Sequence, residues 1–198
     1  MFRTHIKNIE LINDRLSKGQ SLVAITSHYC NWEWFLATCS FQFISPPDGV
    51  YLRVSNPFFE NLMLKIRSRF GAYMIEKKYI LNEAYKRKHM TRVIALVSDQ
   101  APRGERSMNW VRFLNQDTPF INGPERISKI LQLPVIYGKM KRVKRGFYEI
   151  EFAEIETNPE QSPENFITEK FASILEETIL EYPPNWLWSH NRWKETRQ

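Results

Sequence analysis

The stretch SLVAITSHYCNWEWFL, residues 21–36, decides the fold class. Residues 21–26 form a short apolar run rich in β-forming side chains, which is typical of a strand buried on both faces. A polar turn follows, and helical patterning begins only after Asn31. A buried strand that leads through a turn into a helix is the repeating unit of an α/β sheet.

The same unit recurs along the chain. Asn56 is a good N-cap, Pro57 suits the first helical position and Gly71 suits a helix stop, so a helix is predicted between them. Further strands are predicted at residues 50–54 and 92–99 and from residue 134, with helices at 80–89, 123–133 and 162–182. The sequence therefore predicts an α/β fold with a single mixed, mostly parallel sheet covered by helices on both faces, and a hairpin that turns at Gly146 before the last helix.

Residues 101–121 are predicted to form a long loop. A connection of this length exceeds the usual range in compact domains, and such loops often carry function. We therefore expect this segment to contribute to a site.

Composition limits the classes of partner. The chain has 198 residues, which fits one domain over residues 1–198, and its net charge of +6 favours anionic partners such as lipid head groups, nucleic acid or an acidic protein. Two cysteines are too few for a disulfide framework, and with four scattered histidines they form no metal-type cluster, so no metal site is predicted. No apolar run of about 18 residues is present to span a bilayer, and the first twenty residues lack the core of a signal peptide.

His28 and Glu33 are the first candidates for chemistry. On one continuous helix a spacing of five residues would point the two side chains about 140° apart. If His28 lies in the turn after the strand and Glu33 in the first helical turn, the two can converge outside the carboxyl end of the sheet, where open α/β sheets bind ligands. A carboxylate on one imidazole nitrogen makes the other a general base for a hydroxyl group, although a capping carboxylate beside a turn histidine is the alternative interpretation of this spacing.

Five blocks of sequence carry a resemblance to a known family. HYCNWEW resembles the histidine-x4-acid motif of lipid acyltransferases, in the form found in the bacterial late acyltransferases of lipid A biosynthesis. The remaining four blocks follow in the order of that family: RVSNPFFENLMLKIRSRFG, SDQAP, TPFINGPERI and PPNWLWSHNRWK. Together the blocks cover nearly the whole chain, from about residue 21 to residue 194.

The resemblance implies a glycerolphosphate acyltransferase-like fold and transfer of a fatty acyl group from an acyl carrier protein thioester to a hydroxyl of a lipid A precursor or related glycolipid. It implies no cofactor, and it places the reaction at the cytoplasmic face of the bacterial inner membrane, with peripheral association to anionic lipid. Carried over by position, it implies His28 as general base, Glu33 as its orienting partner, Asp99 as a second functional acid, and Arg67, Asn31 and Gly123 as substrate-binding residues. Arg67 is expected to turn inward and grip a phosphate, whereas Lys65 and Arg69 project at other angles.

The chain departs from the family pattern at three places. Family members usually carry Gly where this chain has Cys30, and a second basic residue is common where it has Asn191. Family proteins also carry roughly a hundred residues before this point, including an apolar anchor, so the chain is expected to be a fragment or a shortened form.

Several alternatives stay open. An acyltransferase of the same fold could act on a lysophospholipid or aminolipid, with carrier protein or coenzyme A as donor, or the chain could be a scaffold without turnover. A module for single-stranded nucleic acid has no recognised motif to support it, so no nucleic-acid partner is predicted. The basic run at residues 139–146 is either a patch for anionic partners or the solvated face of a hairpin. The tryptophans of NWLWSHNRW either sit at a membrane interface or pack on the core with Trp188 buried.

Overall fold

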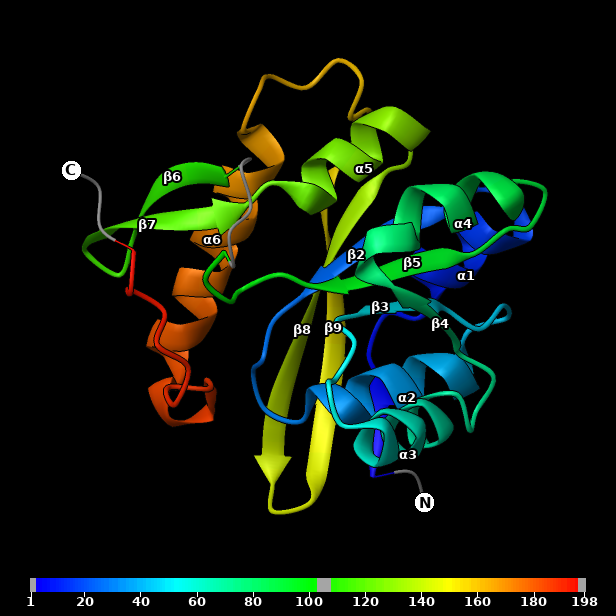
Figure 1. The fold of residues 1–198 in the computed structure, drawn as a ribbon, viewed down its shortest axis with the longest axis horizontal. Coiled ribbons are helices and arrows are strands. Elements are labelled where there is room, and N and C mark those ends of the chain that lie inside the picture. The colour runs from blue at the N-terminus through cyan, green and yellow to red at the C-terminus, as the bar shows by residue number, and fades with distance from the viewer. Residues whose placement is uncertain (1–2, 103–107, 196–198) are drawn as a thin grey trace.

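The computed structural model describes residues 3–102 and 108–195, and it centres on one large sheet (Figure 1). Its seven strands are β1 (Thr4–Ile6), β2 (Leu22–Thr26), β3 (Asp48–Tyr51), β4 (Tyr73–Glu76), β5 (Val93–Val97), β8 (Val135–Lys144) and β9 (Phe147–Glu156). They lie in the order β1-β9-β8-β2-β5-β3-β4. From β8 to β4 the neighbours are parallel, whereas β9 is antiparallel to β8 and β1 is parallel to β9. The predicted class, an α/β fold with a mixed, mostly parallel sheet, is confirmed.

Helices cover both faces of this sheet. The α-helices are α1 (Glu10–Ser17), α2 (Trp32–Gln42), α3 (Pro57–Arg67), α4 (Ile80–Lys86), α5 (Gly123–Leu131) and α6 (Phe166–Glu181), and two short 3-10 helices are η1 (Lys77–Tyr79) and η2 (Pro183–Asn185). Side chains of α4, α5 and α6 share one core cluster, and side chains of α1 and α2 share another. Figure 1 shows α4 and α5 on the opposite side of the sheet from α2 and α3.

Strand β2 lies between these two clusters, which is why its first four residues are apolar. All five of its residues are buried. Val23 and Ile25 belong to the cluster under α4, α5 and α6, and Leu22 and Ala24 belong to the cluster under α1 and α2. Successive side chains of a strand point to opposite faces, so a strand covered on both sides is mostly apolar, and the one polar side chain of β2, Thr26, donates a hydrogen bond to the carbonyl of Gly138.

The predicted N-cap at Asn56 is confirmed, and Asn31 is a second N-cap that was not predicted. The side chain of Asn31 accepts a hydrogen bond from the backbone N–H of Trp34 at 3.1 Å, at the start of α2. The side chain of Asn56 accepts from the N–H groups of Phe58 and Phe59 at the start of α3. These bonds satisfy donors that the first turn of a helix leaves without an intrahelical partner.

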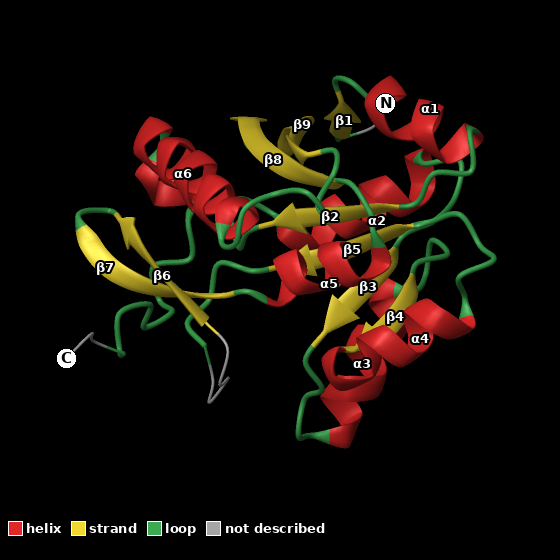
Figure 2. Ribbon diagram, turned by 90° about the horizontal axis from the view of Figure 1, so that it is seen from above, coloured by secondary structure: helices red, strands yellow, loops and turns green. Residues whose placement is uncertain are grey.

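The predicted loop at residues 101–121 is wrong for its second half. Strands β6 (Met108–Phe113) and β7 (Gln116–Ile121) form an antiparallel hairpin, which Figure 2 shows as a separate ribbon beside α6. Its two-residue turn places Leu114 and Asn115 at φ values of 48° and 62°, the backbone of a type I′ turn. Leucine is uncommon in that conformation, so the sequence did not indicate the turn. A proline lies within β7, so the sequence did not indicate the strand. Residues 103–107 of the predicted loop lie outside the described residues.

The predicted hairpin at Gly146 joins β8 to β9, and Gly146 has a φ of 76°. The basic run at residues 139–146 forms the end of β8 and this turn. Two of its lysines, Lys139 and Lys141, form ion pairs with Glu181 at the end of α6. Part of the run therefore attaches the hairpin to a helix.

Candidate active site

His28 lies in the turn beyond the carboxyl end of β2, as predicted. Its backbone C=O accepts a hydrogen bond from the N–H of Leu187 at 3.1 Å, and its ring packs edge to face against Trp32, with centroids 5.0 Å apart. The chain turns from β2 toward α2 at this point, whereas after β5 it turns toward the hairpin and α5. The site therefore lies where neighbouring strands send their connections to opposite faces of the sheet.

Asp99 is the carboxylate that contacts the imidazole. Its Oδ1 lies 2.7 Å from Nδ1 of His28, and its Oδ2 accepts a hydrogen bond from Nε1 of Trp186 at 2.8 Å. The contact follows from the register of two adjacent parallel strands. Thr26 of β2 is paired with Val97 of β5, so the residues two positions beyond each strand meet at one level.

The surroundings of Asp99 keep it ionised. The carboxylate is 2% exposed, and burial alone would raise its pKa. The hydrogen bond and charge of His28, together with the bond from Trp186, outweigh burial and lower the pKa of Asp99 below its ordinary value. An ionised carboxylate on Nδ1 holds the proton of a neutral imidazole on that nitrogen and leaves the lone pair on Nε2.

The structure differs from the expectation that Glu33 orients His28. Glu33 lies in the first turn of α2, where its side chain projects toward α3 and binds Arg67 instead. The ring of Trp32 packs against the imidazole, and the Nδ1 position is occupied by Asp99. Trp32 and Glu33 are the first two residues of α2, and consecutive helical residues project about 100° apart, so Trp32 meets the imidazole and Glu33 faces α3.

Arg67 is the inward-facing basic residue of α3, as predicted. Its Nε and Nη2 donate to the two carboxylate oxygens of Glu33 at 3.0 and 2.6 Å, a bidentate arrangement. This hydrogen bonding raises the pKa of Arg67. Lys65 and Arg69 are exposed, in agreement with the predicted geometry of the helix. The expected phosphate ligand would therefore meet a guanidinium that already has one carboxylate partner.

A cavity of about 510 Å³ opens beside these residues. His28, Glu33, Arg67 and Gly123 line it, together with Gln100, whose Nε2 lies 3.4 Å from Nε2 of His28. Asn31 is not among its lining residues, because the Asn31 side chain caps α2. The structure thus brings Gly123 to the cavity with the histidine and gives Asn31 a structural contact.

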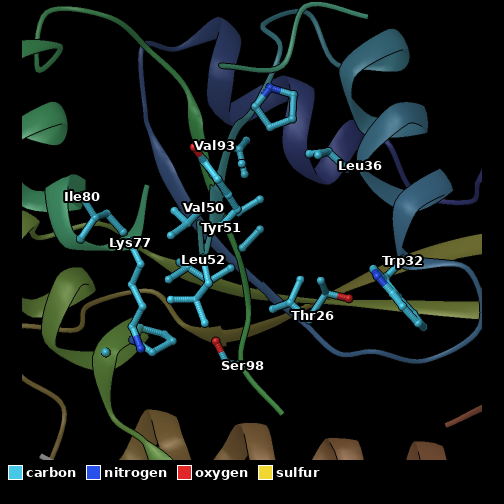
Figure 3. Close-up of a pocket in the computed structure, with 18 of the residues that line it drawn as sticks. Thr26, Trp32, Leu36, Val50, Tyr51, Leu52, Lys77, Ile80, Val93 and Ser98 are labelled. Atoms are coloured by element: carbon cyan, nitrogen blue, oxygen red, sulfur yellow. The ribbon is translucent and has the colours of Figure 1, made fainter. Parts of the chain in front are cut away.

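The cavity extends to both sides of the sheet through a split between two strands. β3 is paired with β5 only through Asp48–Ile94 and Gly49–Ala95, and beyond these pairs the two strands separate. Figure 3 shows Leu36 and Ile80 on opposite sides of the cavity, with Val50, Tyr51 and Leu52 between them. Most of the lining side chains are apolar, so the cavity suits a hydrocarbon chain.

Trp186 and Gln100 are the site residues that the sequence analysis did not assign. Trp186 is 5% exposed and its N–H holds Asp99, whereas Trp188 is 50% exposed. The expectation that Trp188 is the buried tryptophan is therefore wrong. A tryptophan beside a buried carboxylate has a partner for its N–H, but only the fold shows which of the tryptophans occupies that place.

Cys30 has a left-handed backbone with a φ of 55°, a conformation that favours glycine. This explains why glycine suits the position and why its replacement is a strained one. Burial raises the pKa of the Cys30 thiol to about 11, so the thiol is protonated near neutral pH. A protonated thiol is a poor nucleophile, which agrees with the absence of any predicted role for Cys30 in catalysis.

Within residues 3–102 and 108–195, no helix combines the length and the apolar character needed to cross a membrane.

Comparison with known proteins agrees with the geometry of this site. No curated protein matched the sequence. A family model described as bacterial lipid A biosynthesis acyltransferase matches residues 2–195, which is nearly the whole chain. The chain therefore belongs to the bacterial lipid A biosynthesis acyltransferase family.

Proposed function

We propose that the chain transfers a fatty acyl group from an acyl carrier protein thioester to a hydroxyl of a lipid A precursor or related glycolipid. Membership of the family supports an acyltransferase with an acyl donor and a lipid acceptor. The observation that carries the finer proposal is the imidazole of His28, held by a buried carboxylate at an apolar cavity. No cofactor takes part in the proposed reaction.

His28 is the general base in this proposal. Its Nε2 takes the proton of the acceptor hydroxyl while the hydroxyl oxygen attacks the thioester carbonyl, and Asp99 stabilises the imidazolium that forms. The tetrahedral intermediate then collapses, the carbon–sulfur bond breaks, and the imidazolium returns the proton to the leaving thiolate. The products are an ester on the acceptor and the free thiol of the carrier protein.

We assign the acyl chain to the apolar part of the cavity between α2 and the sheet. Phe35, Leu36 and Phe43 line this part from the helix side, and Ala24 and Val93 line it from the strands. Burial of each methylene of an acyl chain stabilises binding by about 0.8 kcal/mol, so a channel of this kind favours long-chain donors.

We assign Arg67 to a phosphate of the acceptor and Glu33 to holding Arg67 in place. A guanidinium has five N–H donors, and Glu33 engages those on two nitrogens, so further donors are available for an anion. Arg67→Lys should slow transfer to a phosphorylated acceptor much more than transfer to its dephosphorylated counterpart, because an ammonium lacks the planar fork. Arg69→Lys, on the exposed side of the same segment, is the matched control and should change neither rate.

The direct test is incubation of the protein with a radiolabelled acyl donor, either the acyl carrier protein thioester or acyl coenzyme A. The acceptor is either a lipid A precursor or a lysophospholipid. Labelled lipid A product from the carrier protein donor, absent with His28→Ala, is the expected result. Labelled product from lysophospholipid alone would move the acceptor to another lipid class. Absence of product from every donor and acceptor would contradict the proposal and favour a fold without turnover.

We also propose that the reaction takes place at the cytoplasmic face of the inner membrane. The net charge of +6 supports attraction to anionic lipid on that face.

A further inference from the structure

Helix α3 has its apolar side facing outward. Phe58, Phe59, Leu62 and Ile66 are 69%, 54%, 39% and 51% exposed, and together they form what we call the α3 apolar face. A surface helix of a globular protein normally turns its apolar stripe to the core and its charged residues to water. In α3 this order is reversed, so the outward face is energetically unfavourable in water.

The inward side of α3 carries two charged residues, Glu60 and Arg67, and the third charged residue of the helix, Lys65, is exposed. Glu60 is 7% exposed and accepts hydrogen bonds from the hydroxyl of Tyr51 at 2.9 Å and from the N–H of Val54 at 2.8 Å. Arg67 is bound to Glu33. These bonds fix the rotation of the helix about its axis, so the α3 apolar face cannot turn inward without breaking them.

Within residues 52–70, the exposed charges have one sign. Between Leu52 and Phe70 the only acidic residue is Glu60, which is buried. Arg53, Lys65 and Arg69 are exposed in the same segment. Large apolar side chains flanked by basic residues, with no exposed carboxylate, are complementary to an interface that contains anionic head groups over hydrocarbon.

The α3 apolar face adjoins the entrance of the cavity. Leu52 and Val54, which precede the helix, are 53% and 40% exposed and also line the cavity, as does Arg67 at the end of the helix. Figures 1 and 2 place α3 at the outer edge of the molecule, beside α2 in the first view and below β4 in the second. An apolar surface therefore continues from the outside of α3 into the cavity.

We propose that the α3 apolar face lies in the surface of an anionic bilayer and directs the entrance of the cavity toward the lipid. The inference deepens the proposed function, on which it rests for the lipid nature of the acceptor. The lipid acceptor could then bring its hydroxyl to His28 at the cavity without leaving the bilayer. An acidic carrier protein would complement the basic residues, but it would leave the four apolar side chains without a hydrocarbon environment, so a bilayer is the better match.

The test is co-sedimentation with vesicles, which requires no turnover. The variant Phe58→Gln/Ile66→Gln should bind vesicles of phosphatidylethanolamine and phosphatidylglycerol about tenfold more weakly or worse, because two large apolar side chains no longer leave water. Glutamine keeps good helix propensity, so α3 should remain folded. The control variant Leu180→Gln/Val143→Gln removes apolar side chains that are 63% and 62% exposed outside α3, and it should bind as the wild type does.

A second variant separates charge from apolar contact. Lys65→Gln/Arg69→Gln should lose about fivefold in binding for each charge removed on anionic vesicles, and much less on vesicles of phosphatidylcholine alone. Rising salt should weaken wild-type binding to anionic vesicles, since the screening length is only about 10 Å at 0.1 M salt.

Three outcomes would overturn the inference. Wild-type vesicle binding by Phe58→Gln/Ile66→Gln would show that another surface binds the bilayer. Normal vesicle binding with lost affinity for acyl carrier protein, measured by calorimetry, would assign the face to that protein. A change in oligomeric state of the same variant, without a change in vesicle binding, would assign it to a second copy of the chain. If vesicle binding depends on α3 but no acceptor is acylated, the docking surface stands and the proposed reaction fails.

Discussion

Either Asp99 or Glu33 could be the residue that orients the imidazole of His28, and substitutions at the two positions have different expected effects. If Asp99 orients the imidazole, Asp99→Asn should lower kcat by about a hundredfold or more, because the amide no longer fixes the tautomer or stabilises the imidazolium. Glu33→Gln should lower kcat far less and should act mainly on KM for a phosphorylated acceptor, through Arg67. Steady-state kinetics of both variants, with ¹⁵N NMR of the His28 ring to identify the protonated nitrogen, makes the comparison. Equal losses of kcat with an unchanged tautomer in Asp99→Asn would return the orienting role to Glu33.

The lowered pKa of Asp99 also predicts how stability depends on pH. Its folded-state pKa lies below the ordinary value of 3.8, so the folded state binds this proton more weakly than the unfolded state does. The resulting stabilisation is fully present above about pH 4 to 5 and is lost as the pH falls through the folded-state pKa. Urea unfolding of the wild type should therefore show a steeper loss of free energy of unfolding below pH 4 than unfolding of Asp99→Asn. Parallel curves for the two proteins would show that the carboxylate contributes no such stability.

Contact between α2 and the hairpin β8–β9 predicts the effect of a small substitution. A Cβ on Gly138 of β8 would lie 2.3 Å from Cζ of Phe35, a side chain of α2 that lines the cavity. Gly138→Ala must therefore displace the ring, at a cost of about 1–3 kcal/mol, or roughly 2–10 °C in Tm for a chain of this size. Differential scanning calorimetry measures the shift.

Gly123, at the start of α5, is the matched control for that measurement. A Cβ there would meet its nearest neighbour at 3.5 Å, which is ordinary contact. Gly123→Ala should leave Tm unchanged or raise it slightly, since alanine is the better helix residue. A drop in Tm as large as that of Gly138→Ala would mean that steric contact with Phe35 is not the cause.

One end of the sheet carries the candidate active site, and the other end carries buried ion pairs that connect strands and a helix. The site lies beyond the carboxyl ends of β2 and β5, whereas the opposite end holds a buried ion cluster. There Oδ1 of Asp48 lies 2.7 Å from Nη1 of Arg87, and Oδ2 lies 2.8 Å from Nε of Arg92. Asp48 has no exposed surface, so its carboxylate joins β3, the end of α4 and the start of β5.

Removal of the Asp48 charge should destabilise the protein without changing the chemistry. Asp48→Asn leaves two guanidinium groups with an uncharged partner, and loss of one member of a buried pair costs about 3–5 kcal/mol. Urea unfolding should show this loss, while kcat per folded molecule stays at the wild-type value. The exposed pair Arg112–Asp117, at 3.8 Å, provides the control, since Asp117→Asn should cost less than about 1 kcal/mol. A large fall in kcat for Asp48→Asn would show that the two ends of the sheet are coupled.

Local sequence determined the units of this fold. The apolar run in β2 predicts a strand buried on both faces, and Asn31 and Asn56 mark the starts of α2 and α3 by hydrogen bonds within one helical turn. The family blocks place His28 beyond a strand end, and that is where it lies. These features depend on interactions between residues close in the chain, or on whether a segment is buried, and both leave a pattern in the sequence.

Only the tertiary structure decided which carboxylate meets the imidazole. Glu33 is five residues from His28 and Asp99 is 71 residues away, yet Asp99 makes the contact, because β2 and β5 are neighbours in register. Strand order and register arise from packing of the whole sheet, and no local pattern records them. The reversed face of α3 has the same origin in part, since the bond of Arg67 to Glu33 joins residues 34 positions apart and helps to set the rotation of the helix. The sequence determined which residues are candidates for the site, and the fold decided which of them contact one another.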